Sequence, residues 1–221
     1  MKNKQTAESA MLTRFQVGEV VLAPLVVRKA ILENAIRGAG AVDARVELAI
    51  PGDAEGFRFA VESKSRSTPE TIRSAIGQAT LAAVDGEWPM IQVPYLSPMQ
   101  LEELEKAKVS GVDLCGNGVV IIPSRLYVIR TGQPNQYRDS RPLNNPYRGR
   151  SEMVARMLLQ SPRWCSLKEL AAAIEMAGEK LSLPQISKAV QALKEDLIVI
   201  KNAGSISLID PLRLLDNFGN K

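Results

Sequence analysis

The sequence contains no histidine and only two cysteines, Cys115 and Cys165. Two cysteines do not make a disulfide framework, and without histidine the usual ligand sets of zinc sites are missing. A Ser-His-Asp triad is excluded for the same reason, and neither thiol has a histidine to activate it. We therefore expect both cysteines to be packing residues in a protein of a reducing compartment.

Long apolar runs are missing too. The most apolar stretch, residues 20–32, is interrupted by Pro24, Arg28 and Lys29, so it is too short and too charged to span a bilayer. The first ten residues are polar and lack the apolar core of a signal peptide. No P-loop and no dinucleotide-binding glycine pattern occurs. These absences favour a cytoplasmic protein without a membrane partner.

The hydrophobic and charged content of the sequence is ordinary, but the positive charge is unevenly distributed along the chain. The 221 residues, 45% hydrophobic and 24% charged, allow one large or two small globular domains. Residues 141–221 carry 12 Lys/Arg and 8 Asp/Glu, a balance of +4, whereas residues 1–140 carry 16 of each. This placement of the positive charge is expected of a part that contacts phosphates. Chance asymmetry of a solvated surface is the alternative.

Residues 1–130 show the pattern of an α/β (α+β) domain, a mixed sheet with helices on its faces. Apolar spacing and turn residues predict its elements in this order: a helix over Leu12–Arg37, strands over Arg45–Ile50 and Phe57–Ser63, a helix from Thr68 to about Val84, a strand over Trp88–Pro94, a helix over Pro98–Lys108, and short strands over 112–114, 119–122 and 126–130.

Residues 131–150 form a linker without periodicity, rich in Gln, Pro, Asn and Gly. It contains Arg138, Arg141, Arg148 and Arg150. Such a segment either is simply solvated or lies along phosphates, and the sequence leaves both interpretations open.

Residues 151–221 predict three helices, a hairpin and a last short helix. The helices are expected over Ser151–Leu159 and Leu167–Met176 and from Leu183 onward. At Ser182-Leu183-Pro184-Gln185 the third helix has a capping residue, a first-turn proline and a capping-box partner. Strands 197–200 and 205–209 flank the turn Asn202-Ala203-Gly204. A helix with a polar face followed by a tight hairpin is typical of a winged helix-turn-helix.

We therefore expect the third helix to enter a DNA major groove and the hairpin to lie on the backbone. A glutamine can pair with adenine through two hydrogen bonds, which points to Gln185 and Gln191 as base readers. A single module binds weakly, so a homodimer on a two-fold site is expected. The candidate DNA-binding residues are Gln185, Ser187, Lys188, Gln191, Lys194, Lys201, Asn202, Arg141, Arg148 and Arg150.

The strand over Phe57–Ser63 ends in Glu62-Ser63-Lys64, just before a helix. This Glu-x-Lys resembles the core of the PD-(D/E)xK nuclease-like, or restriction endonuclease-like, fold over about Ile31–Pro94, with Glu33 on the preceding helix. The resemblance implies Mg²⁺ bound by Glu62 and a neighbouring acid such as Asp43, and a lysine that positions water. The residues of such a nuclease site would be Asp43, Glu47, Glu62, Lys64 and Gln78.

Simple counting across the turn weighs against that activity. If Ile50 lies opposite Phe57, Arg45 lies opposite Glu62 and Asp43 opposite Lys64. An ion pair between Arg45 and Glu62 would neutralise the metal ligand. A nuclease-like scaffold without activity and an active Mg²⁺-dependent endonuclease are the two interpretations.

The run Val112-Asp113-Leu114-Cys115-Gly116-Asn117 resembles the Asp-Leu-x-Gly-Asn signature of bacterial regulators of the AbiEi antitoxin type. The resemblance extends over about Arg45–Phe218. It implies a transcriptional regulator or an antitoxin of a type IV toxin–antitoxin system, with a toxin as a possible partner protein. Here the winged helix comes last, whereas some of these antitoxins place the DNA reader first. Locally, Asp113 and Asn117 either satisfy backbone groups of a turn or bind a ligand.

Overall fold

The computed structural model describes residue 11 and residues 14–32, 41–137 and 145–219. Its contacts divide the chain into two compact units. One comprises Met1–Ser67 and Thr71–Arg138, and the other is formed mainly by Asp139–Lys221. Within the described residues, no helix is both long enough and apolar enough to cross a membrane.

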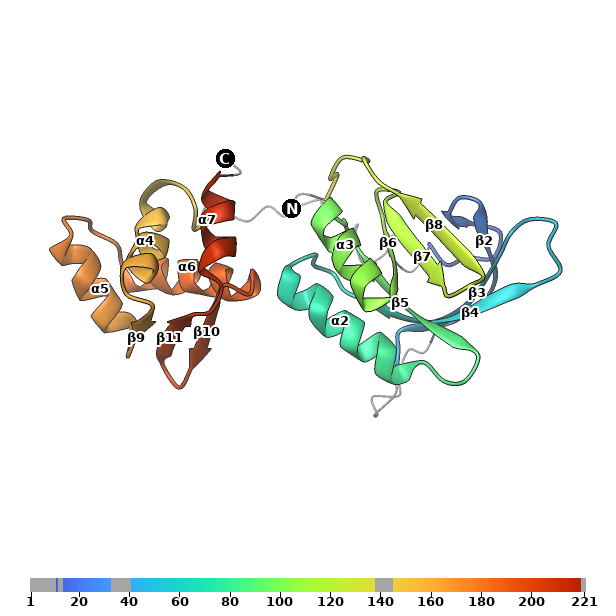
Figure 1. Cartoon of the computed structure of the whole chain (residues 1–221), viewed down its shortest axis with the longest axis horizontal. Helices are drawn as coiled ribbons and strands as arrows, with labels where there is room; N and C mark the ends of the chain where they lie inside the picture. The colour runs from blue at the N-terminus through green and yellow to red at the C-terminus, as the bar shows by residue number, and fades with distance from the viewer. Residues whose placement is uncertain (1–10, 12–13, 33–40, 138–144, 220–221) are drawn as a thin grey trace. The chain divides into compact units, whose positions relative to one another are not determined.

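In the described part of the N-terminal unit, eight strands form a mixed sheet and lie side by side in sequence order. Figure 1 shows this sheet with its helices. Strands β4, β5 and β6 are parallel, and all other neighbours are antiparallel. Helices α2 (Pro69–Ala82) and α3 (Pro98–Ala107) connect the parallel strands. The strands are β1 (Val20–Leu22), β2 (Leu25–Leu32), β3 (Ala44–Ala49), β4 (Gly56–Ser63), β5 (Glu87–Val93), β6 (Ser110–Asp113), β7 (Gly118–Ile122) and β8 (Leu126–Arg130). The predicted mixed sheet flanked by helices is confirmed.

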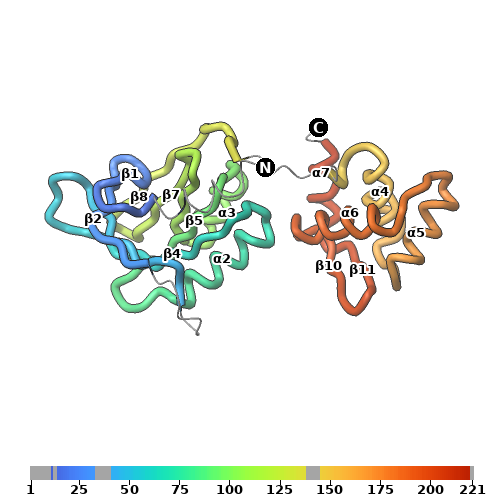
Figure 2. The backbone as a smooth tube through the Cα atoms, turned by 180° about the vertical axis from the view of Figure 1, so that it is seen from behind, coloured from blue at the N-terminus to red at the C-terminus, as the bar shows by residue number. Residues whose placement is uncertain are grey.

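The two faces of this sheet bury different clusters. The sheet curves until β1 lies beside β7 (Figure 2), and it encloses a core that includes Leu25, Leu48 and Phe59. The opposite face is covered by both helices, with Ile72 of α2 and Leu104 of α3 fully buried. Alternation along β5 and β7 sends successive side chains to these two clusters: Met90 and Val120 lie in the first, and Ile91 and Val119 in the second.

The helix predicted over Leu12–Arg37 is wrong for the described part of that range. Residues 20–22 and 25–32 are strands β1 and β2, while residues 33–37 lie outside the described residues. The alternation of Leu25 and Val27, both buried, with the less buried Val26 has the period of a strand. Valine and isoleucine also favour strands because their branched side chains restrict rotamers in a helix.

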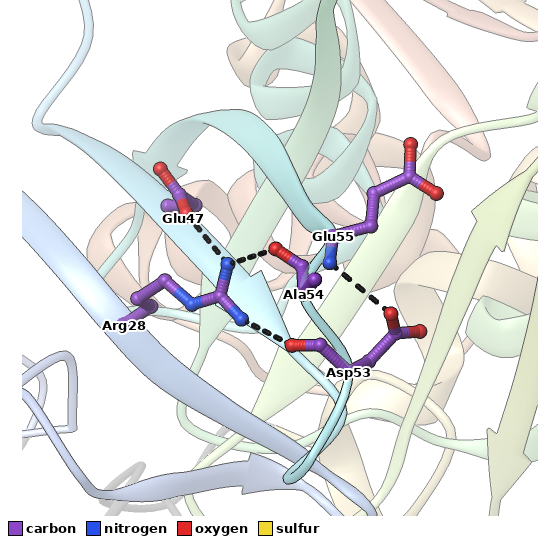
Figure 3. Close-up of polar contacts among 5 residues, drawn as sticks. All are labelled: Arg28, Glu47, Asp53, Ala54 and Glu55. Carbon is purple, nitrogen blue, oxygen red and sulfur yellow. Dashed lines mark hydrogen bonds and ion pairs between the residues drawn. The ribbon is translucent and has the colours of Figure 1, made fainter.

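The hairpin of β3 and β4 forms as predicted, but its register differs by two residues. Leu48, rather than Ile50, lies opposite Phe57, and Arg45 lies opposite Ala60. The turn between the strands lies at residues 50–55, one residue earlier than expected. Arg28 of β2 binds it: the guanidinium donates to the carbonyl oxygens of Asp53 and Ala54 at 2.7 and 2.9 Å (Figure 3).

The C-terminal unit combines helices with a small sheet. Its elements are a short 3-10 helix (Gly149–Ser151), α4 (Glu152–Gln160), β9 (Arg163–Trp164), α5 (Leu167–Met176), α6 (Leu183–Glu195), β10 (Val199–Asn202), β11 (Ser205–Leu208) and α7 (Pro211–Gly219). The antiparallel sheet has the order β10-β11-β9. The sequence predicted the helices and the hairpin and missed β9. The core includes Leu158, Leu170, Ile174 and Leu193.

Helix α6 (Leu183–Glu195) begins where its sequence signals predict. Ser182 and Gln185 form the capping box, and Pro184 occupies the first turn. The hairpin that follows turns through only two residues, Ala203 and Gly204, both with positive φ. That conformation matches the twist of the flanking strands, so β10 and β11 pair without a gap.

Candidate functional site

Helix α6 presents a polar surface on the side opposite the core. Ile186, Ala189, Val190 and Leu193 are buried, whereas Lys188 and Gln191 are exposed. Gln185 is also exposed, and Ser187 and Lys194 are half-buried. Helical spacing therefore separates one apolar and one polar side, and the polar side carries the amides and lysines expected from the sequence.

The two glutamines of α6 have different local partners. The Oε1 atom of Gln185 accepts hydrogen bonds from the backbone N–H and the hydroxyl of Ser182, each 2.9 Å long. Gln191 donates a long hydrogen bond of 3.4 Å to Glu195, one turn further on. The carbonyl oxygen of Gln185 is thus committed to starting the helix, and Gln191 is the better placed of the two for an outside partner.

The remaining basic candidates lie on the hairpin and before α4. On the hairpin, Lys201 is half-buried and Asn202 is exposed. Arg148 and Arg150 are exposed at the start of the C-terminal unit. Arg138 and Arg141 lie outside the described residues, so the structure gives no position for these two linker arginines.

The two ends of the predicted linker pack against the units that they join. Gln133 exchanges hydrogen bonds with the side chain of Asn117 in the N-terminal unit. Tyr147 packs against the core of the C-terminal unit, where its hydroxyl contacts Asp196 and its ring meets the ring of Phe218 edge-on. Residues 131–137 are therefore held by the N-terminal unit, and residues 145–150 by the C-terminal unit.

The nuclease-like residues meet at the carboxyl end of β4. Glu62 is 7% exposed, and its carboxylate forms an ion pair of 2.6 Å with the ammonium group of Lys64. Asp43, just before β3, accepts a 2.7 Å hydrogen bond from the backbone N–H of Ser63. Two carboxylates and a lysine thus lie at one edge of the sheet, the place where open α/β sheets commonly bind ligands.

The other members of the predicted set lie elsewhere. The carboxylate of Glu47 is 3.5 Å from Arg28, near the opposite end of β3. Gln78 is exposed, on the side of α2 that faces away from the sheet. The expected pair of Arg45 with Glu62 is wrong, because Arg45 pairs with Glu87 instead. The two-residue register difference moves Arg45 away from Glu62 along the strand.

Both candidate magnesium ligands already have partners within the protein. The carboxylate of Glu62 is occupied by Lys64, and that of Asp43 by a backbone N–H. Over residues 14–32, 41–137 and 145–219, no group of three or more His, Cys, Asp or Glu side chains is placed to hold a metal ion. Mg²⁺ binding typically needs several oxygen ligands in near-octahedral order. Glu33 lies outside the described residues.

In the Asp113–Asn117 run, both named side chains satisfy backbone groups, which was one of the two interpretations of this run. Asp113 is fully buried, and its carboxylate accepts hydrogen bonds from the backbone N–H groups of Leu96, Cys115, Gly116 and Asn117 and from the Asn117 side chain. These bonds are 2.7–2.9 Å long. The carboxylate thus replaces water for the backbone of two loops.

Cys115 belongs to the same turn and is half-buried. Its Sγ atom lies 3.6 Å from the carbonyl oxygen of Pro94. Burial raises the pKa of the Cys115 thiol, and the nearby Asp113 carboxylate adds to this rise. A thiol with a raised pKa is a poor nucleophile, which agrees with the predicted packing role of Cys115. The same prediction is wrong for Cys165, which is exposed.

Sequence reasoning missed a groove between α5 and the segment that leads into α6. It encloses about 470 Å³, and its lining includes Lys168, Ala171, Ala172, Glu175 and Lys180. Helical spacing places Lys168, Ala171, Ala172 and Glu175 on one side of α5, which was a readable signal. The sequence gives no comparable signal that the segment after α5 folds over that side.

We compared the sequence with models of known protein families and with curated protein sequences, and neither comparison gave a match. The functional argument therefore rests on the residues and geometry of this chain.

Proposed function

We propose that the protein is a DNA-binding transcriptional regulator whose C-terminal unit is a winged helix-turn-helix. The supporting observation is the arrangement around α6: α5 precedes it through a short turn, and the β10–β11 hairpin follows it directly. Strand β9 pairs with β11 and completes the small sheet. In a winged helix-turn-helix the last helix of the pair enters the major groove and the hairpin, or wing, contacts the backbone.

In this proposal, Gln191 reads a base and Lys188 contributes charge. Both are exposed on the polar side of α6. A glutamine amide can form two hydrogen bonds with adenine, and the long bond of Gln191 to Glu195 is weak enough to be exchanged for them. An ammonium group attracts phosphates irrespective of sequence. Gln185 has a smaller part in base reading than the sequence suggested, because its carbonyl oxygen caps the helix.

Phosphate contacts come from the residues around α6. Asn202 lies at the tip of the wing with Lys201 beside it, and Ser187 and Lys194 flank the exposed residues of the helix. Arg148 and Arg150 extend the positive surface at the start of the unit. Such contacts orient the protein on the duplex without reading sequence.

The N-terminal unit, in this proposal, is a nuclease-like scaffold without catalysis of its own. The ion pair of Glu62 with Lys64 supports an inactive site. The resemblance to AbiEi-type antitoxins suggests a role for this unit in holding a toxin partner. We further propose a homodimer in the cytoplasm, since two modules on a two-fold operator bind far more tightly than one.

The experiment is a selection from a pool of random DNA duplexes. We expect the wild-type chain to enrich a motif with two related half-sites. Gln191→Ala should relax the preference at one position in each half-site by about 1–3 kcal/mol of discrimination. Lys188→Ala should weaken binding about equally for all sequences. Failure to bind any duplex at low salt would refute the proposal.

The second candidate is a Mg²⁺-dependent DNA endonuclease delivered by the winged helix. The gathering of Asp43, Glu62 and Lys64 at one sheet edge favours it. Supercoiled plasmid is incubated with the wild-type chain and with the Glu62→Ala/Lys64→Ala double variant, in Mg²⁺ or Mn²⁺. Metal-dependent cutting that only the double variant loses would establish the endonuclease. Under our proposal, the two proteins give the same background.

A further inference from the structure

The outward side of helix α2 carries no charge over its C-terminal half. Between Arg73 and Asp85 the sequence contains no charged residue. Helix α3, which covers the same face of the sheet, exposes Glu102 and Lys106. A helix that faces water ordinarily carries charged side chains on its solvent side, whereas the centre of a protein–protein interface is depleted of them. This part of α2 therefore has the composition of a covered surface.

Two apolar side chains on that side of α2 are strongly exposed. Leu81 is 84% exposed, and Val84, just after the helix, is 58% exposed. Gly77 lies one turn before Leu81 on the same side, and a Cβ atom there would meet nothing within 4 Å. Glycine lowers the stability of a helix interior, and no close approach within the described residues requires it here. A protruding leucine thus lies beside a recess.

The two ends of this surface carry opposite charges. Arg73, whose side chain is 64% exposed, lies at one end, and Asp85 is exposed at the other. The ion pair of Arg73 with Glu103 is long, at 3.8 Å, so the guanidinium can take a second partner. Two copies of α2 that pack antiparallel bring Arg73 of each near Asp85 of the other. A partner with charge of only one sign would match one end and be repelled at the other.

We propose that the outward side of α2 is the two-fold interface between two copies of this chain. Three pairs of its residues have the same midpoint, level with residue 79: Gly77 and Leu81, Ser74 and Val84, Arg73 and Asp85. When two antiparallel helices cross at that level, Leu81 of each copy fills the recess at Gly77 of the other. The pairs of Arg73 with Asp85 then close both ends and fix the antiparallel direction.

The inference rests on the proposed function in its choice of a second copy over another protein, and it names the surface that the proposed homodimer uses. The contact lies in the N-terminal unit, whereas α6 belongs to the C-terminal unit. Pairing through α2 therefore needs no DNA. It leaves two tethered C-terminal units available for two half-sites of an operator.

The test measures the monomer–dimer equilibrium of the full-length chain by sedimentation equilibrium over a series of protein concentrations. Leu81→Arg should weaken the dimer by more than about tenfold, because each dimer loses two buried leucines and gains two unpaired charges. Met99→Arg is the matched control, since Met99 is an exposed apolar residue of the neighbouring helix α3. It should keep the wild-type dissociation constant.

Two further sets of variants separate the interface from the stability of the subunit. Gly77→Leu fills the recess and should weaken the dimer, although leucine is the better helix former and keeps the subunit at least as stable. Arg73→Asp and Asp85→Arg should each weaken the dimer as well. The double variant Arg73→Asp/Asp85→Arg exchanges the two charges and should restore it, which a purely structural role would not produce. Circular dichroism checks that each variant is folded.

The outcomes separate this inference from the function on which it rests. If Leu81→Arg and Gly77→Leu both dimerise like the wild type, the copies meet elsewhere, and the α2 interface is refuted while the proposed dimer stands. If the wild-type chain stays monomeric at every concentration, with and without its selected duplex, α2 faces another partner and both the interface and the dimer are refuted. A wild-type dimer that binds no duplex refutes the DNA-binding function and leaves the α2 interface intact.

Discussion

The hydroxyl group of Tyr147 donates a hydrogen bond of 2.5 Å to the carboxylate of Asp196, the residue at the C-terminal end of α6. Asn217 of α7 donates to the same tyrosine oxygen at 3.0 Å. One phenol thus joins the start of the C-terminal unit to the end of α6 and to the last helix. Burial, followed by the nearby charge of Asp196, strongly raises the pKa of Tyr147.

This raised pKa predicts a loss of stability at alkaline pH. In the unfolded chain tyrosine ionises near pH 10. Because the folded state keeps Tyr147 protonated, its contribution is complete below that pH and declines as the pH rises above it, by at most about 1.4 kcal/mol per pH unit. Denaturant unfolding between pH 8 and 11 measures this decline.

Tyr147→Phe is the matched variant. It should be less stable than the wild type at pH 8, because a hydrogen bond to a charged group contributes about 1.5–3 kcal/mol. It should also show a smaller decline above pH 10. Trp88→Phe as a background leaves Trp164, which packs in the C-terminal unit, as the single tryptophan probe. Parallel pH profiles for the two proteins would contradict the assignment.

Asp113→Asn should destabilise the N-terminal unit. The neutral amide has one acceptor oxygen for a site that presents five N–H donors, so some donors lose their partner in a buried place. We expect the free energy of unfolding to fall by roughly 2–4 kcal/mol. Denaturant unfolding monitored by the fluorescence of Trp88 measures this loss. The exposed Asp85→Asn should change it by less than about 0.5 kcal/mol.

The capping box of α6 predicts a stability effect for Gln185 that is separate from DNA binding. Gln185→Ala removes the acceptor of the Ser182 N–H and should lower the stability of the C-terminal unit by about 1 kcal/mol. Gln185→Glu replaces the amide oxygen by a carboxylate oxygen, which also accepts these hydrogen bonds, and should keep wild-type stability. Equal thermal unfolding of both variants and the wild type would show that the cap contributes nothing.

Two glycines should respond in opposite ways to alanine. A Cβ atom at Gly118 of β7 would lie 2.7 Å from the carbonyl oxygen of Gly111, a backbone atom that cannot turn aside. Gly118→Ala should therefore cost about 1–3 kcal/mol. At Gly77, inside α2, a Cβ atom meets nothing within 4 Å. Gly77→Ala should raise the unfolding free energy by up to about 1 kcal/mol.

The sequence predicts the helices and strands whose formation depends on their own residues, such as capping residues and apolar spacing. Leu167–Met176 matches α5 at both ends, and the capping residues located the start of α6. The two strands that became β3 and β4 show clean alternation and were found. Their register was not, because the turn between them is held by Arg28 from β2, a contact between residues that are distant in sequence.

Elements that depend on tertiary contacts were harder to predict. The sequence pattern predicts a helix where β2 lies, because Pro24 and the charged Arg28 and Lys29 obscure the strand period of Leu25 and Val27. β9 contains two residues and exists because β11 lies beside it. At the candidate site, the polar side of α6 was readable from spacing. The commitment of Gln185 to the cap and the groove at Lys168 depend on how the chain folds around them.

The strand order of the large sheet has a consequence for biosynthesis. Each strand after β1 pairs with the strand that the ribosome produced just before it, so no pairing waits for a distant segment. Short separations keep the entropic cost of closing each loop small. We therefore expect the sheet to extend strand by strand during translation, and to be fully paired once residue 130 has left the exit tunnel.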